Sequence, residues 1–143
     1  RTALDLFAGS GQLGIEALSR GAQRAVFVDR RTDAVKLIRE NLALTRLEEG
    51  AQVVCVDSMA YLNALREKFD LIFLDPPYAD DLLERAVAHI ARFDILAPDG
   101  IMIAESPAEK ELPKLSAPYR VAREYRYGRI KVTLYRRDGE ETT

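Results

Sequence analysis

The segment Asp75-Pro76-Pro77-Tyr78 has the residue types to hold a flat ring that carries an amino group. Proline fixes φ and has no N–H, and it pushes the residue before it toward extended geometry, so this segment is restricted. An amino group on a flat ring has two N–H donors and a lone pair delocalised into the ring. The Asp75 carboxylate and the Pro76 carbonyl could accept both hydrogens and leave the lone pair pointing at an electrophile. Pro77 and Tyr78 would contact the ring, with Tyr78 stacked on it. A proline turn without chemistry is the alternative, because short motifs give false matches.

A second chemical segment is the glycine-rich run Gly9-Ser10-Gly11-Gln12-Leu13-Gly14. Its spacing matches the G-x-G-x-x-G fingerprint of dinucleotide-binding sheets. Glycines let the backbone turn tightly and approach a ligand, and the start of the following helix offers free N–H donors. An acidic residue about 20 positions further on can bind ribose hydroxyls, and Asp29 fits this spacing. On the loop alone, a nicotinamide or flavin cofactor stays open.

The carboxylates around the glycine loop favour S-adenosyl-L-methionine over a dinucleotide. Asp5, just before the glycines, suits a ligand with a positive ammonium better than one with a pyrophosphate. Asp29 would then hold the ribose and Asp57 the adenine, with the sulfonium methyl near Asp75. S-adenosyl-L-homocysteine would be the product. The predicted cofactor-binding residues are Asp5, Phe7, Ala8, Gly9, Ser10, Gly11, Gly14, Asp29, Arg30, Asp57, Ser58, Met59 and Asp75.

Strands and helices must alternate along the chain to position these residues. Apolar runs predict strands over 3–8, 25–28, 53–56, 71–74 and 101–104. Helical spacing predicts helices over 13–19, 32–45, 60–66 and 81–92, the second capped by Thr32. The runs 121–127 and 129–136 predict a β-hairpin joined at Gly128. This order indicates an α/β fold with a mostly parallel sheet covered on both faces. Ligands bind at the carboxyl ends of such strands, where Asp29, Asp57 and Asp75 stand, while Asp5 lies inside the first strand.

Size and composition predict one domain over residues 1–137 and a loose tail over 138–143. The chain has 143 residues, 48% of them hydrophobic and 31% charged, which is ordinary for a soluble globular protein. No apolar run approaches the roughly 20 residues that span a bilayer. The single cysteine, Cys55, lies in an apolar run, which predicts a small buried side chain in a reducing, cytoplasmic environment. Because His89 is the only histidine, we expect no metal site. Separately, we expect the protein to be a monomer.

A basic stretch near the C-terminus could contact RNA phosphates, although the net charge is only −2. Arg126 and Arg129 are the predicted contacts, and interleaved tyrosines strengthen this hypothesis. A solvated surface without a ligand is the alternative. The stretch contains Arg120, Arg123, Arg126, Arg129, Lys131, Arg136 and Arg137 against Glu124.

Three segments together make the chain resemble the RsmD family of bacterial methyltransferases. They are Asp5 to Ala22, with the sequence pattern DLFAGSGxxGIEALSRGA, then Phe27-Val28-Asp29, and then Asp75 to Tyr78. The resemblance implies a Rossmann-like class I S-adenosyl-L-methionine-dependent methyltransferase with strand order 3-2-1-4-5-7-6. It also implies methylation of a guanine exocyclic amine (N2) in 16S ribosomal RNA, as free RNA or in the small-subunit particle. Family members carry a basic N-terminal segment before the first strand, whereas Arg1 begins that strand here, so we expect either a fragment or a member without this extension.

Other classes of protein stay open on the sequence. A DNA methyltransferase acting on the amine of adenine or cytosine uses the same loop, but no separate target-recognition region is visible. Glutamine methyltransferases prefer asparagine where this chain has Asp75. A catalytically silent RNA-binding assembly factor is the third alternative, and the intact loop argues against it.

Overall fold

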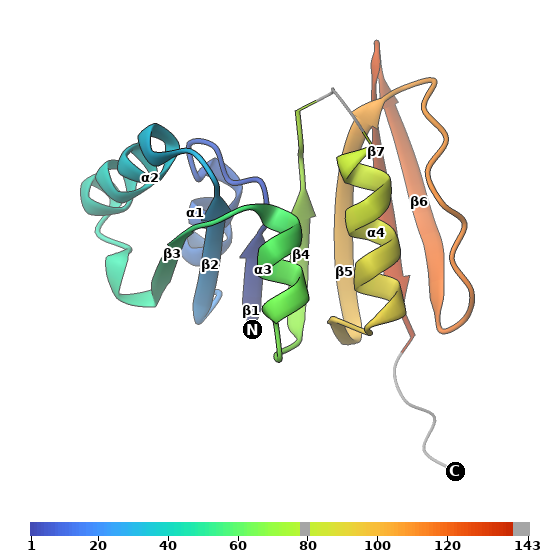
Figure 1. Ribbon diagram of the computed structural model, residues 1–143, viewed down its shortest axis with the longest axis horizontal. Helices are drawn as coiled ribbons and strands as arrows, with labels where there is room; N and C mark the ends of the chain where they lie inside the picture. Colours follow the sequence, from blue (N-terminus) through green and yellow to red (C-terminus); the bar gives the residue numbers. More distant parts are fainter. Residues whose placement is uncertain (78–80, 139–143) are drawn as a thin grey trace. The chain divides into compact units, whose positions relative to one another are not determined.

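The computed structural model describes residues 1–77 and 81–138, and Figure 1 shows the elements in these ranges. The chain divides into two compact units, unit 1 from Arg1 to Arg66 and unit 2 from Glu67 onward. Unit 1 contains β1 (Thr2–Asp5), α1 (Gln12–Ser19), β2 (Arg24–Asp29), α2 (Thr32–Thr45), the short 3-10 helix η1 (Glu48–Gly50), β3 (Ala51–Cys55) and α3 (Ser58–Ala64). Unit 2 contains β4 (Phe69–Leu74), α4 (Leu82–Arg92), β5 (Leu96–Pro107), β6 (Tyr119–Tyr127) and β7 (Ile130–Arg137). Within the described ranges, no helix is both long enough and apolar enough to cross a membrane.

The strand order β3-β2-β1-β4-β5-β7-β6 confirms the predicted mostly parallel, Rossmann-like sheet with its closing antiparallel hairpin. The strand bounds differ from the prediction at several ends, and the differences are largest in β1 and β5. β1 ends at Asp5 and not at Ala8, because the chain already turns toward the glycine loop after Asp5. β5 begins at Leu96 and not at Ile101, and the register shifts between Phe69 and Leu71, so that Phe69 pairs with Leu96 and Leu71 with Ile101.

Unit 1 is a parallel three-stranded sheet in which β1 pairs with β2 and β2 with β3. α1 packs against β1 and β2, and α2 packs against β2 and β3. In the view of Figure 1, α1 lies behind these strands and α3 in front of them. A Cβ at Gly14 would lie 2.4 Å from the Phe27 ring, so only glycine lets α1 approach β2 this closely. Since the strands are parallel, their carboxyl ends meet at one edge, which carries Asp5, Asp29 and the segment after β3.

Unit 2 combines one parallel and two antiparallel strand pairs. β4 runs parallel to β5, whereas β7 is antiparallel to both β5 and β6. Helix α4 lies against β5 and buries its apolar face through Leu83, Ala86, Val87 and Ile90 (Figure 1). The strands alternate buried and partly exposed residues, so one face of this sheet forms the core of unit 2 and the other stays more accessible.

Asp94 joins four parts of unit 2 through its carboxylate. The Arg137 guanidinium donates from Nε to Oδ1 at 2.6 Å and from a terminal nitrogen to Oδ2 at 3.0 Å. The Tyr119 hydroxyl donates to Oδ1 at 2.7 Å, and Lys68 Nζ donates to Oδ2 at 2.8 Å. These donors come from the segment before β4, the start of β6 and the end of β7, while Asp94 follows α4. One carboxylate thus fixes the ends of several elements, and nothing in the sequence pattern had pointed to it.

Two local predictions are wrong. Helix α2 begins at Thr32 itself, with Arg31 as the N-cap residue and no side-chain capping bond. Cys55 is exposed and not buried, because β3 is the edge strand of the sheet, and its Sγ donates to the Arg30 carbonyl at 3.6 Å. An apolar run therefore does not guarantee burial when a neighbouring strand is missing on one side.

Candidate active site

The glycine loop of unit 1 leaves open space at its first glycine. Gly9 has φ 58° and Gly11 has φ 82°, values in the left-handed region that side chains rarely adopt. A Cβ at Gly9 would meet nothing within 4 Å, whereas one at Gly11 would lie 3.2 Å from Ile38. Gly9 therefore faces accessible space, and Gly11 faces the α2 side of the core. Of the other predicted loop residues, Phe7 is half-buried, Ala8 is buried and Ser10 is exposed.

Asp5 is the buried anchor of this loop. It is 2% exposed, and its Oδ2 accepts the backbone N–H of Gly14 at 3.1 Å. This bond satisfies one of the N–H groups that a helix start leaves without an intrahelical partner. Asp5 thereby holds the first turn of α1 against the end of β1, in addition to the cofactor role predicted for it.

Asp29 ties the glycine loop to the end of β2. Its Oδ2 accepts the Gly9 N–H at 3.0 Å, and its Oδ1 accepts the Arg31 N–H at 3.0 Å. The Asp29 side chain is 12% exposed, and the Arg31 guanidinium lies 3.6 Å from it. The carboxylate is thus held at the accessible side of Gly9, where the fingerprint predicts a ribose-binding group.

The residues after β3 begin helix α3. Asp57 is the N-cap residue, and its Oδ2 accepts the Ala60 N–H at 3.1 Å. Ser58 is buried and Met59 is half-buried in the first turn, while Arg30 is exposed after β2. The structure therefore places Asp57 and Arg30 at the same strand edge as Asp29, as predicted from the parallel pairing.

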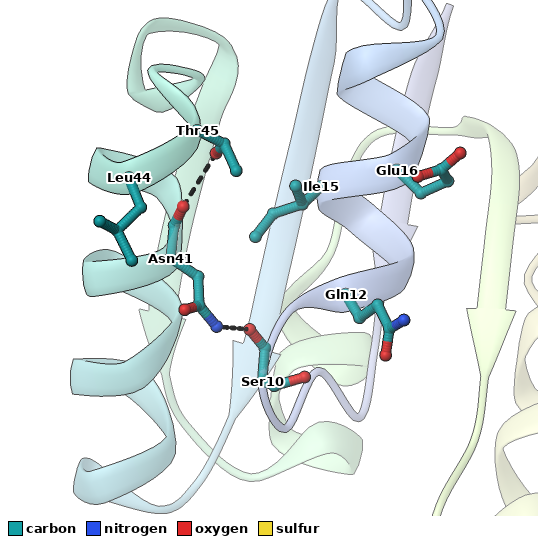
Figure 2. A pocket seen from close by; sticks show the side chains of 7 residues that line it. All are labelled: Ser10, Gln12, Ile15, Glu16, Asn41, Leu44 and Thr45. Atoms are coloured by element: carbon teal, nitrogen blue, oxygen red, sulfur yellow. Dashed lines mark hydrogen bonds between the residues drawn. The ribbon is translucent and has the colours of Figure 1, made fainter.

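A shallow hollow of about 370 Å³ lies between α1 and α2, beside the glycine loop (Figure 2). Asn41 on α2 donates from Nδ2 to the Ser10 carbonyl at 2.9 Å and so fixes the loop from outside. Asn41 was not predicted, because a polar residue on an amphipathic helix gives no signal of a contact 31 positions away. The hollow between α1 and α2 is lined by Ser10, Gln12, Ile15, Glu16, Asn41, Leu44 and Thr45.

In unit 2, the Asp75 carboxyl is hydrogen-bonded to that of Glu105 on β5. Leu74 pairs with Ala104, so Asp75 and Glu105 are neighbours one position further along two parallel strands. Burial raises the pKa of Asp75, against the hydrogen bond with Glu105, which lowers it. Burial also raises the pKa of Glu105, and the Asp75 charge and the hydrogen bond to Asp75 act in the same direction.

Two carboxyl groups this close together disfavour the ionisation of both at once. Partial burial raises the pKa of the Asp75 carboxyl group, but the residue as a whole is exposed, so a ligand can reach it. Pro76 is buried and Pro77 is exposed, while Tyr78 lies outside the described residues. Glu105 was missed, although a glutamate interrupting the apolar run of β5 was a usable signal.

The hairpin arginines differ in their surroundings. Arg126 donates to the Ala108 carbonyl at 3.2 Å, on the same face of β6 as Glu124, whose carboxylate lies 3.4 Å from Lys131. Arg129 is exposed in the turn between β6 and β7. Arg123 points to the other face and donates to the Tyr125 hydroxyl at 3.1 Å. The basic stretch is therefore divided between two faces of the hairpin.

Each unit contributes a different chemical capability. Unit 1 offers an open glycine, loop N–H groups and carboxylates at one strand edge, which suits a ligand with hydroxyl and ammonium donors. Unit 2 offers an accessible carboxylate followed by two prolines, which suits a planar amine. Within the described parts of the chain, no group of three or more histidine, cysteine, aspartate or glutamate side chains could hold a metal ion.

Comparison with known proteins gives consistent matches over nearly the whole chain. The family model described as conserved hypothetical protein 95 matches residues 1–136. Ribosomal RNA small subunit methyltransferase D of Escherichia coli (strain K12) is 34% identical over 96% of this chain and 69% of its own length. YlbH of Bacillus subtilis (strain 168) is 40% identical over 95% of this chain and 76% of its own length. A solved structure of a conserved hypothetical protein from Streptococcus pyogenes superposes with a TM-score of 0.89 at 35% identity, covering 99% of this chain and 88% of that chain.

Proposed function

The chain belongs to the RsmD family, which the conserved hypothetical protein 95 model describes, and on that premise we propose that it methylates the N2 amine of a guanine in small-subunit ribosomal RNA. Methylation of ribosomal RNA with S-adenosyl-L-methionine as the methyl donor follows from the family. The guanine amine is the finer part of the proposal. The observation that carries it is the accessible Asp75 at the end of β4, followed by two residues without N–H donors.

The residues of unit 1 fit the methyl donor. The open space at Gly9 admits a ligand close to the backbone, and the Asp29 carboxylate beside it can accept from two ribose hydroxyls. Asp57, Ser58 and Met59 are proposed to flank the adenine, and Asp5 the amino acid end. When bound, S-adenosyl-L-methionine supplies a methyl group on a positively charged sulfur.

The residues of unit 2 would orient the target amine. The Asp75 carboxylate and the Pro76 carbonyl accept its two N–H groups, so that the nitrogen lone pair is aimed and not rotating freely. Alignment of this kind is a large source of rate enhancement. The nitrogen loses a proton once it is methylated, and the Asp75 carboxylate is the acceptor in contact with it. Pro77 and Tyr78 are proposed to contact the base.

The hairpin is proposed to contribute affinity for the RNA backbone. Arg129 is exposed in the turn, and Arg126 lies near it on β6. Guanidinium groups bind phosphate with charge-assisted hydrogen bonds, and such contacts supply affinity without reading sequence.

A label-transfer experiment tests the proposed function. The full-length protein, S-adenosyl-L-methionine labelled on its methyl group, and ribosomal RNA or small subunits lacking modification are incubated, and the label is mapped. We expect label on the N2 of one guanine. Label on an adenine or cytosine amine, or on DNA only, would support the DNA methyltransferase alternative instead. A melting temperature raised by NADH and not by S-adenosyl-L-methionine would overturn the cofactor assignment.

Replacing Asp29 with alanine should weaken S-adenosyl-L-methionine binding about 10-fold or more, since charge-assisted hydrogen bonds contribute about 1.5 kcal/mol or more each. The change also frees the Gly9 N–H from its partner, which loosens the loop. Titration calorimetry measures the affinity. Asp33→Ala, an exposed aspartate in the first turn of α2, is the matched control and should bind normally. Unchanged affinity in Asp29→Ala would place the ribose elsewhere.

A further inference from the structure

Tyr125 and Tyr127 on β6 present two nearly parallel rings to solvent. Their ring centroids lie 6.4 Å apart with an interplanar angle of 19°, and Tyr127 is 65% exposed. Stacked bases are spaced about 3.4 Å apart, so the two rings are separated by about twice that distance. A flat base inserted between them would contact both rings.

The strand registers place this tyrosine pair on the same face of unit 2 as Asp75. Tyr125 pairs with Val132 across β6 and β7, and Val132 pairs with Glu105 across β7 and β5. Glu105 in turn is hydrogen-bonded to Asp75. Directly paired residues point to the same side of a sheet, so Tyr125, Val132 and Glu105 share one face, and Asp75 continues their row beside Glu105, one position beyond the Leu74–Ala104 pair. Three strand spacings of about 4.8 Å separate Asp75 from Tyr125, a distance of about 14 Å.

The tyrosine face is the open face of the hairpin and carries positive charge. Arg123 lies on it and donates to the Tyr125 hydroxyl. On the opposite face, Lys131 is buried and its Nζ donates to the Lys110 carbonyl, so the segment after β5 covers that side. A guanidinium beside two aromatic rings matches the chemistry of single-stranded nucleic acid, which offers phosphates and flat bases together.

We propose that Tyr125 and Tyr127 form a stacking site for a nucleotide of the substrate RNA that flanks the target guanine. The inference rests on the proposed function, because Asp75 defines the position of the target base. About 14 Å corresponds to a small number of nucleotides in an extended strand, so the stacked base is a near neighbour of the target and not the target itself. The site therefore selects single-stranded or opened RNA around the modified position.

Replacement of either ring tests the site by separating substrate affinity from chemistry. Tyr125→Leu and Tyr127→Leu keep an apolar side chain and remove the ring, whereas Tyr125→Phe and Tyr127→Phe keep the ring. We expect the leucine variants to raise the KM for RNA about 10-fold at an unchanged kcat, since stacking on an aromatic residue is lost. The phenylalanine variants should stay near the wild type. Phe93→Leu, which removes an exposed aromatic ring at the end of α4, is the control and should change neither constant.

Fluorescence gives a second measurement that uses wild-type protein and therefore does not depend on whether a variant folds. RNA oligomers carry 2-aminopurine at successive positions on either side of the guanine, and stacking on wild-type protein should quench the probe at one flanking position. Leucine variants with unchanged KM, or equal quenching at every position, would overturn the stacking site alone. Wild-type protein that transfers no methyl group but quenches the probe at one position would sustain the stacking site and reject the proposed function.

Discussion

Replacing Asp75 with alanine should lower kcat for methyl transfer by at least about 100-fold, while the affinity for S-adenosyl-L-methionine stays within a small factor. In the proposed mechanism the carboxylate faces the target amine, so its loss would remove the group that accepts an N–H and receives the proton. Single-turnover label transfer measures the rate, and calorimetry measures cofactor affinity. Glu111→Ala, an exposed carboxylate elsewhere in unit 2, should leave both unchanged. Near-normal turnover in Asp75→Ala would reject the amine-acceptor mechanism.

Two conservative variants show what the carboxylate contributes. Asp75→Asn keeps an acceptor oxygen and loses the charge, so it should retain measurable activity only if alignment dominates.

The pKa of Asp75 is raised, and therefore this carboxyl takes up a proton at higher pH than the ordinary value of 3.8. Activity that needs the carboxylate falls as pH is lowered through that raised pKa. Glu105→Gln replaces the acid whose hydrogen bond lowers the pKa of Asp75 with a weaker amide donor, which should move the acid limb of the kcat profile to higher pH. A limb that stays in place would show that the pair does not control Asp75.

Replacing Asp94 with alanine should lower the free energy of unfolding by about 2–3 kcal/mol. Removing one partner of a buried ion pair costs about 3–5 kcal/mol, and the value is smaller here because the Asp94 side chain is 39% exposed and screened by solvent. Arg137, whose side chain is 10% exposed, would lose both of its bonds to the carboxylate. Urea unfolding at neutral pH measures the change. Asp138→Ala, which removes an exposed partner of Arg120, is the control and should cost much less.

The pH dependence of this effect has a defined sign. The Arg137 hydrogen bond, helped by Lys68 and Tyr119, holds the pKa of Asp94 well below its usual value of 3.8. A carboxyl with a depressed pKa stabilises the fold above its unfolded pKa and loses that contribution as pH falls toward the folded pKa. Asp94 has φ 55°, which asparagine tolerates, so Asp94→Asn isolates the charge. The stability difference between wild type and Asp94→Asn should be full at neutral pH and shrink below pH 3.8. A difference independent of pH would assign the effect to packing.

The order of elements was predictable because strands and helices differ in local apolar period. The glycine loop, Asp29 and Asp75 were found for the same reason, since they stand at the ends of apolar runs. The features that could not be predicted from the sequence depend on pairing across the sheet. Glu105 becomes the partner of Asp75 only through the register of β4 and β5.

Other features that were not predicted also depend on contacts between residues far apart in the sequence. Asp94 and Arg137 are 43 positions apart, so no local pattern links them. Cys55 was misjudged because an apolar run does not show whether its strand is central or at an edge. The division of the hairpin arginines between two faces follows from alternation along β6, including a register shift between Val121 and Arg123 that simple counting would miss.

The contact between Gly14 and Phe27 has a consequence for sequence variation. A Cβ at position 14 would lie 2.4 Å from the Phe27 ring, so the two positions share one fixed volume. A residue larger than glycine at position 14 is compatible with the same helix position only if position 27 becomes smaller. Two sites that lie 13 positions apart and on different elements are thus constrained as a pair, and divergent members of the family should change them together or not at all.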